Sequence, residues 1–130
     1  NGGERSLLLV GHGPLDHQIH LACQQLPRPQ AVSLAPFVGL EQLGNYYGQA
    51  HALILPSLKD TWGLVVNEAM AVGLPVIVSD ACGCVDDLVI NQQTGLTFEA
   101  HNPIDLAACL WKLEHQTSSD RFRMISQASE

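Results

Sequence analysis

The chain has 130 residues, of which 46% are hydrophobic and 15% charged, and this composition is typical of a globular domain that buries a core without disulfides. Thirteen acidic residues against six basic ones give a net charge of −7, which disfavours nucleic acid as a partner because phosphate binding needs a basic face. The longest apolar runs are far shorter than the roughly 20 residues that cross a bilayer, so no transmembrane segment is expected.

Four cysteines in a chain without a visible signal peptide favour free thiols over a disulfide framework, and a cytoplasmic location. The chain lacks an initiating methionine and enters an apolar strand almost at once, which predicts that it is a piece of a longer protein. Attachment to the periphery of a membrane through the rest of that protein stays open.

Short apolar runs alternate along the chain with segments of helical periodicity. Glycine, proline or polar turns close the runs, so the runs predict strands and the segments between them predict helices. The expected strands are Leu7–Val10, Ala31–Leu34, Ala52–Leu55, Pro75–Val78 and Leu96–Phe98. The expected helices begin at Asp16, Leu40, Gly63, Asn102 and Ser118 or Ser119.

This alternation predicts that residues 1–130 form one α/β domain, a Rossmann-like parallel sheet with helices on both faces. Asp16 and Asn102 are expected to cap their helices, and Gly73 is expected to end the helix that begins at Gly63. Trp111 is expected to pack into the core. Parallel sheets bind ligands where loops leave the carboxyl ends of the strands, so the candidate sites are in those loops.

The first of these loops, Gly11-His12-Gly13-Pro14, invites comparison with a dinucleotide-binding fingerprint. It does not match, because Asp16 stands at the position of the third glycine and Pro14 removes an amide. A plain strand-to-helix turn is the favoured interpretation.

The loop after the third strand carries the clearest chemical signal. Asp60 and Glu68 are separated by seven residues across a loop and a helix start, and Gly63 lets a ligand approach the backbone closely. The amides of Gly63, Leu64 and Val65 would be unpaired donors of the first turn, a site for a phosphate or diphosphate. Glu68 lies about one turn further in, where its carboxylate can accept both hydroxyls of a ribose. On spacing alone, two solvated acids favoured by the helix dipole explain the pattern equally well.

These residues resemble the signature of the retaining GT-B glycosyltransferases, above all the group 1 enzymes of glycosyltransferase family 4. Asp60 and Glu68, with seven residues between them, are part of that signature. The resemblance continues through Trp62-Gly63-Leu64-Val65, Glu68-Ala69-Met70-Ala71 and Gly73-Leu74-Pro75-Val76. It extends to Val10-Gly11-His12-Gly13-Pro14, Pro56-Ser57, Ser79-Asp80 and Thr94-Gly95-Leu96.

The resemblance implies that the chain is the carboxy-terminal, donor-binding half of a two-domain enzyme. That enzyme would transfer a hexosyl group from a nucleotide sugar to an acceptor with retained anomeric configuration, without a metal or cofactor. The acceptor-binding, amino-terminal domain is missing here, so the isolated chain would be inactive. The resemblance puts the ribose on Glu68, the transferred sugar on Asp60, the base at Val38 and the diphosphate at Gly63, Leu64 and Val65.

The sequence departs from the family's pattern in several places. Asp60 stands where the family has Glu, and Pro36 stands where it has glycine. The family's domain also opens with one more strand and helix, which carry an Arg and a Lys for the diphosphate. That strand would lie between those matching Leu7–Val10 and Ala52–Leu55, so we expect two unpaired sheet edges, closed by rearrangement or by another chain.

These departures keep a second hypothesis open, a non-catalytic nucleotide-binding or scaffolding domain with a GT-B-like fold. A third hypothesis, a related nucleotide-sugar epimerase, fits the helix with Glu68-Ala69-Met70-Ala71 less well.

Two groups of metal-ligating or nucleophilic side chains have plainer interpretations. One predicted helix carries His17, His20 and Cys23, each three residues after the last. At this spacing the three side chains point in directions around the helix that differ too much for a tetrahedral metal site. Cys82 and Cys84 follow the fourth strand, where a turn that faces a ligand needs small side chains. We therefore expect no metal site and no cysteine nucleophile.

Overall fold

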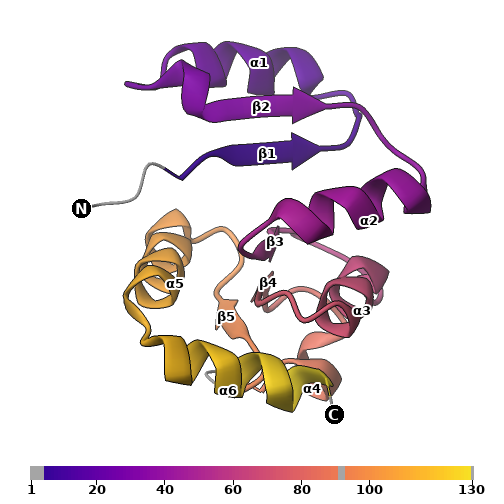
Figure 1. Cartoon of the computed structure of the whole chain (residues 1–130). Coiled ribbons are helices and arrows are strands. Elements are labelled where there is room, and N and C mark those ends of the chain that lie inside the picture. Colours follow the sequence, from indigo (N-terminus) through magenta and orange to yellow (C-terminus); the bar gives the residue numbers. More distant parts are fainter. Residues whose placement is uncertain (1–4, 91–92, 130) are drawn as a thin grey trace. The chain divides into compact units, whose positions relative to one another are not determined.

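The computed structural model describes residues 5–90 and 93–129, which divide into two compact units, Asn1–Gly44 and Asn45–Glu130 (Figure 1). The first unit contains β1 (Leu7–Val10), α1 (Asp16–Gln24), a 3-10 turn (Pro29–Ala31), β2 (Val32–Ala35) and the start of α2 (Leu40–Gln49). The second contains the end of α2, β3 (Leu53–Leu55), α3 (Leu64–Ala71), β4 (Val76–Ser79), α4 (Val85–Leu88), β5 (Leu96–Phe98), α5 (Pro103–His115) and α6 (Ser118–Ser129).

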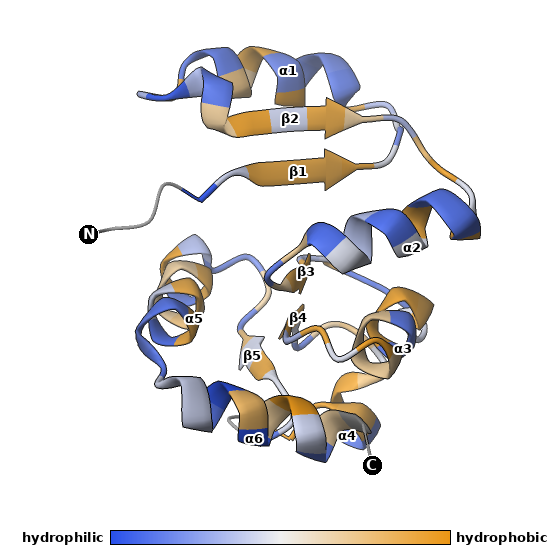
Figure 2. Cartoon of the chain, viewed as in Figure 1, coloured by the Kyte–Doolittle hydropathy of each residue, from blue (hydrophilic) through white to orange (hydrophobic). Residues whose placement is uncertain are grey.

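The first unit is a β-α-β arrangement in which β1 and β2 pair in parallel, with Leu7 opposite Val32 and Val10 opposite Ala35. Figure 2 shows both strands as mainly hydrophobic and α1 as mixed. No described residue from Arg5 to Gly44 is fully buried, and Leu7 is 41% exposed. Two strands and one helix offer too little area to enclose a side chain on every side.

The second unit contains the buried core. Its parallel sheet has the order β3-β4-β5, and every residue of the central β4 is buried. Helices α3 and α5 cover opposite faces of this sheet (Figure 1). One side of β4 meets Val66, Ala69 and Met70 of α3, which recur at helical spacing. On the other side lies a cluster formed by Ile77, Leu96, Phe98, Cys109, Leu113 and Met124.

The expectation of Rossmann-like parallel strands with helices on both faces is confirmed, with one difference in pairing. In the described residues the strands form two sheets, β1-β2 and β3-β4-β5, rather than one. β1 pairs with β2 and β3 pairs with β4, each within its own unit, and the expected unpaired edges stay a prediction. None of the described helices combines the length and apolar character that a membrane span requires.

Two of the expected helix ends agree with the structure and one does not. The Asn102 side chain accepts a hydrogen bond from the Asp105 amide at 3.0 Å, and Gly73 follows α3 with a φ of 77°. Asp16 is not the cap of α1 but its first residue, after Leu15. Its carboxylate is directed back to the preceding loop instead.

The expectation that Trp111 packs into the core is wrong. Trp111 is 62% exposed and stacks on His115, with ring centroids 4.2 Å apart. The buried side of α5 carries Cys109 and Leu113. Trp111 is two residues from each of them, and two residues correspond to a rotation of about 200° around a helix, so its side chain is directed to the opposite side.

Backbone hydrogen bonds clamp the loop after β3 to the loop after β4. The Gly83 amide donates to the Asp60 carbonyl at 3.0 Å, and the Cys84 amide donates to the Trp62 carbonyl at 3.0 Å. Asp60 also forms a parallel bridge with Cys82. A Cβ atom at Gly83 would lie 2.0 Å from the carbonyl oxygen of Thr61, so the two loops approach this closely only because residue 83 is glycine.

Replacement of Gly83 by alanine should therefore separate the two loops. We expect Gly83→Ala to lower the free energy of unfolding by about 1–3 kcal/mol, because the new methyl group meets backbone and not a flexible side chain. Gly39→Ala is the matched control, since a Cβ atom there meets nothing within 4 Å. The measurement is thermal or denaturant unfolding of both variants, and equal stabilities would contradict the close approach described above.

Candidate functional site

The residues expected to bind a ligand divide between the two units. Asp60, Gly63, Leu64, Val65 and Glu68 all lie in the second unit, on the loop after β3 and on the first turns of α3. Val38 belongs to the first unit, where it is half-buried in the irregular stretch between β2 and α2. The second unit therefore brings together the residues expected for the sugar, the diphosphate and the ribose.

Gly63 determines where α3 begins. It precedes the helix with φ 88° and ψ 62°, a left-handed conformation that side chains other than glycine rarely adopt. A Cβ atom there would also lie 2.9 Å from Cδ2 of Leu55, at the end of β3. The backbone conformation requires glycine here, whereas the contact with Leu55 is with the end of a flexible side chain, which can shift. The helix starts beside the carboxyl end of the strand.

The first turn of α3 has free donors. Among the described residues, the amides of Gly63, Leu64 and Val65 donate to no other group, while the Val66 amide closes a turn onto the Gly63 carbonyl at 2.9 Å. Gly63 itself is buried, while Leu64, the first residue of the helix, is 69% exposed. Unpaired amides and the positive end of the helix dipole together favour an anion.

Glu68 lies one turn further along α3, on the same side as Leu64 because the two are four residues apart. Its carboxylate is half-buried, and its Oε2 accepts a hydrogen bond from the Tyr47 hydroxyl at 3.0 Å. Burial, this hydrogen bond and the charge of Glu68 raise the pKa of Tyr47 well above its usual value. Tyr47 is therefore a neutral donor at physiological pH, and Glu68 is an acceptor.

Sequence reasoning missed Tyr47 and gave it no role beyond its place in the helix expected to begin at Leu40. Its position offered a partial signal, because a tyrosine on the buried side of a helix usually finds a partner for its hydroxyl. The identity of that partner depends on how α2 and α3 pack, and no local pattern contains this information.

Asp60 is held by its own loop. Its Oδ1 accepts a hydrogen bond from the Trp62 amide at 3.1 Å. This bond forms a local turn of the backbone and leaves Oδ2 for another partner. The indole Nε1 of Trp62 donates to Oδ1 of Asn67 on α3 at 2.8 Å. These two bonds tie the loop to the helix and fix the carboxylate beside the helix start.

The cysteines near this loop are buried and protonated. Cys82 is hydrogen-bonded to Ser57, and Cys84 lies under Gly63. Burial, together with the negative charge of Asp60, raises the pKa of both thiols. Thiols of this kind are weak nucleophiles, so the two cysteines act here as small packing residues.

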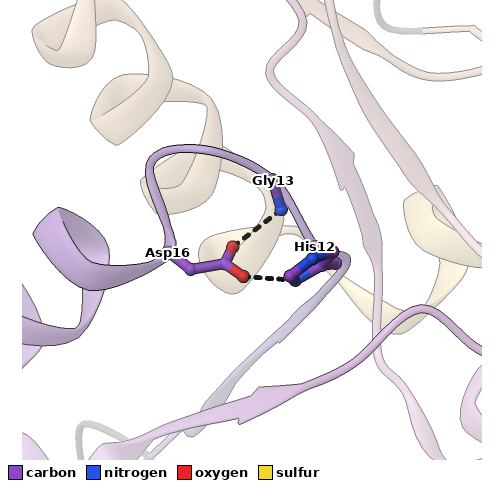
Figure 3. Close-up of polar contacts among 3 residues, drawn as sticks. All are labelled: His12, Gly13 and Asp16. Carbon is purple, nitrogen blue, oxygen red and sulfur yellow. Dashed lines mark hydrogen bonds and ion pairs between the residues drawn. The ribbon is translucent and has the colours of Figure 1, made fainter.

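The loop after β1 closes on itself (Figure 3). Oδ1 of Asp16 accepts a hydrogen bond from the Gly13 amide at 2.9 Å, and Oδ2 pairs with Nδ1 of His12. The amide that a phosphate would need is thus used by a carboxylate, as expected for a plain turn. Within the described part of the chain, no three His, Cys, Asp or Glu side chains are close enough to hold a metal ion, and this includes His17, His20 and Cys23.

Two hollows lie elsewhere on the second unit. One, of about 510 Å³, is lined by residues of α5 and α6 such as Trp111 and Arg123. Another, of about 460 Å³, lies beside Met70 and Asp87. Neither of these two hollows is lined by Glu68.

The chain is similar to known sugar transferases. A family model described as "Glycosyl transferases group 1" matches residues 1–130. The sulfoquinovosyl transferase of Arabidopsis thaliana is 33% identical over 110 residues, which are 85% of this chain and 21% of that protein. The structure of sucrose-phosphate synthase from Thermosynechococcus elongatus has a TM-score of 0.83 at 27% identity, over 95% of this chain and 32% of that chain.

A further solved structure has the same fold. The Anabaena protein HepE, in complex with UDP-glucose, has a TM-score of 0.85 at 21% identity, over 95% of this chain and 35% of that chain. The chain thus spans between 21% and 35% of the length of these relatives. Because the family model covers it from end to end, the chain belongs to the group 1 glycosyl transferases.

Proposed function

We propose that the chain is the donor-binding domain of a retaining glycosyltransferase, which transfers a hexosyl group from a nucleotide sugar to an acceptor. The observation that carries this proposal is the start of α3, where free amides and an acidic side chain follow one another along one helix. Family membership supports sugar transfer, and HepE supports the choice of donor because it was solved with UDP-glucose. The acceptor would bind to another domain of the same protein, in carbohydrate biosynthesis in the cytoplasm.

The diphosphate of the donor would bind at the amides of Gly63, Leu64 and Val65. The chain carries a net charge of −7, so an anion is attracted here by local dipoles and not by the overall field of the chain. As the glycosyl bond breaks, negative charge accumulates on the leaving diphosphate, and fixed N–H groups stabilise it without a metal or cofactor. Basic side chains outside this segment would add to that stabilisation.

The sugar and the nucleoside would lie on either side of the diphosphate. Glu68 would accept hydrogen bonds from the ribose hydroxyls, since an ionised carboxylate is an acceptor only. The backbone at Val38 would contact the base. Asp60 would face the transferred sugar with the carboxylate oxygen that its own loop does not use.

We expect Glu68→Ala to weaken binding of the nucleoside diphosphate that the protein prefers by about 10- to 100-fold, because charge-assisted hydrogen bonds to the ribose are lost. Titration calorimetry of the whole protein that carries this domain, with UDP, GDP and ADP and their glucose conjugates, measures the effect. Glu41→Ala, which removes an exposed acid from the first turn of α2, is the control and should bind as the wild type does. Unchanged affinity in the Glu68 variant would refute the ribose assignment.

A second candidate function is a nucleotide-binding domain that has lost its chemistry. The observation in its favour is Asp60, whose side chain is one methylene shorter than the family's Glu and whose Oδ1 is already bonded to the Trp62 amide. Both features limit how far this carboxylate reaches toward a sugar.

Asp60→Asn separates the two candidates. The amide oxygen of Asn can still accept the Trp62 hydrogen bond, so the loop keeps its shape while the charge is lost. In an active transferase we expect the rate of nucleoside diphosphate release from the preferred nucleotide sugar to fall by about 100-fold, with donor affinity nearly unchanged. A wild type that binds the donor without turnover, or a variant as fast as the wild type, would favour the non-catalytic function.

A further inference from the structure

The hydrogen bond between Tyr47 and Glu68 joins two helices of the second unit. Tyr47 lies near the end of α2 and is 8% exposed, and its hydroxyl is 3.0 Å from Oε2 of Glu68. The two residues are 21 positions apart in the sequence, so the bond is a tertiary contact and not part of one helix.

This hydroxyl is also the one group bonded to the Glu68 carboxylate within residues 5–90 and 93–129. A half-buried carboxylate with one oxygen held by a hydroxyl presents its other oxygen, Oε1, to a further donor.

We propose that Tyr47 is a positioning residue for the donor nucleotide: its hydroxyl holds Oε2 of Glu68 so that Oε1 meets the ribose hydroxyls. This inference rests on the proposed function, in which Glu68 binds the ribose. It adds a residue of α2 to a site otherwise made by the loop after β3 and by α3.

The physical benefit is preorganisation. A free glutamate side chain rotates about several bonds, and binding of a ribose would have to immobilise it. Tyr47 immobilises it before the ligand arrives, because the buried phenol ring itself has little freedom. A lysine at the same place would form an ion pair and compete with the ribose for the carboxylate. A neutral hydroxyl leaves acceptor capacity on both oxygens.

The test measures how strongly the protein depends on the ribose hydroxyls. UDP, GDP and ADP are first compared, and the one that binds most tightly to the whole protein is chosen. This nucleoside diphosphate and its 2′,3′-dideoxy form are then titrated separately into each variant. The quantity compared between variants is the ratio of the two dissociation constants. The variants are Tyr47→Phe, Glu68→Gln, the double variant and Tyr46→Phe. Tyr46 is the matched control, because it precedes Tyr47 on α2 and its hydroxyl has no partner among the described residues.

We expect the wild type and Tyr46→Phe to bind the ribose form more tightly than the dideoxy form by the same ratio. Tyr47→Phe should lower that ratio about three- to tenfold while binding of the dideoxy form stays as in the wild type. In the Glu68→Gln background, Tyr47→Phe should change the ratio no further, because the carboxylate through which it acts is gone.

The possible outcomes separate this inference from the proposed function. If the wild type does not discriminate between the two forms, the ribose role of Glu68 fails and the inference fails with it. If Glu68→Gln abolishes discrimination while Tyr47→Phe retains the full ratio, the proposed function stands and the positioning role is refuted. A lower melting temperature of Tyr47→Phe with an unchanged ratio would make the hydrogen bond purely structural and would also refute it.

A second variant covers the case in which Tyr47→Phe does not fold. Difluorotyrosine at position 47 keeps the ring and the hydroxyl, but this hydroxyl loses its proton at a lower pH than that of tyrosine. A phenolate cannot donate to Glu68 and repels it. We therefore expect the ratio to fall at alkaline pH in this variant and to stay constant in the wild type; a ratio that stays constant in both would overturn the inference.

Discussion

The left-handed conformation of Gly63 is the constraint on which the candidate site depends. It turns the chain out of the loop after β3 and into α3 within one residue, in a conformation that side chains other than glycine rarely adopt. The first amides of the helix consequently lie at the carboxyl end of the strand, where parallel sheets bind ligands. The hydrogen bonds donated by the Gly83 and Cys84 amides hold this loop from the loop after β4. The shape of the loop is therefore fixed before any ligand binds.

The two units differ in how many side chains they bury. The unit that ends at Gly44 has no fully buried side chain among its described residues, since a pair of strands with one helix encloses little volume. The second unit has a sheet covered on both faces, with Ile77 at its centre. The residues proposed for sugar, diphosphate and ribose belong to the second unit, so their geometry rests on the better-packed part of the chain, while the base contact at Val38 belongs to the other.

Local patterns predicted the elements well, because their signals lie within a few residues. Apolar runs indicated the strands, and Asn102 and Gly73 marked helix ends through chemistry that acts over one turn. Asp60 and Glu68 were proposed as site residues in the same way, from their spacing and from a motif. The prediction that Trp111 packs into the core was wrong, because the apolar character of a residue does not show which side of α5 faces the sheet. The partner of Tyr47 was not predictable, because it is 21 residues away and the pairing depends on the packing of two helices.

The hydrogen-bond donors of the site are separate from its acidic acceptors, and this separation suits the proposed ligand, a nucleotide sugar. Carboxylates repel a diphosphate, so an acidic chain needs neutral, directional donors where the phosphates bind, and the free amides of the first turn supply them. Hydroxyl-rich groups need acceptors, and in the proposed function Glu68 on α3 and Asp60 on the loop before it would supply them. A neutral tyrosine beside Glu68 fits this division better than a cation would, because it orients the carboxylate without reducing its charge. A ligand with both anionic and hydroxyl-bearing parts needs both donors and acceptors, and the loop after β3 together with the first turns of α3 presents both.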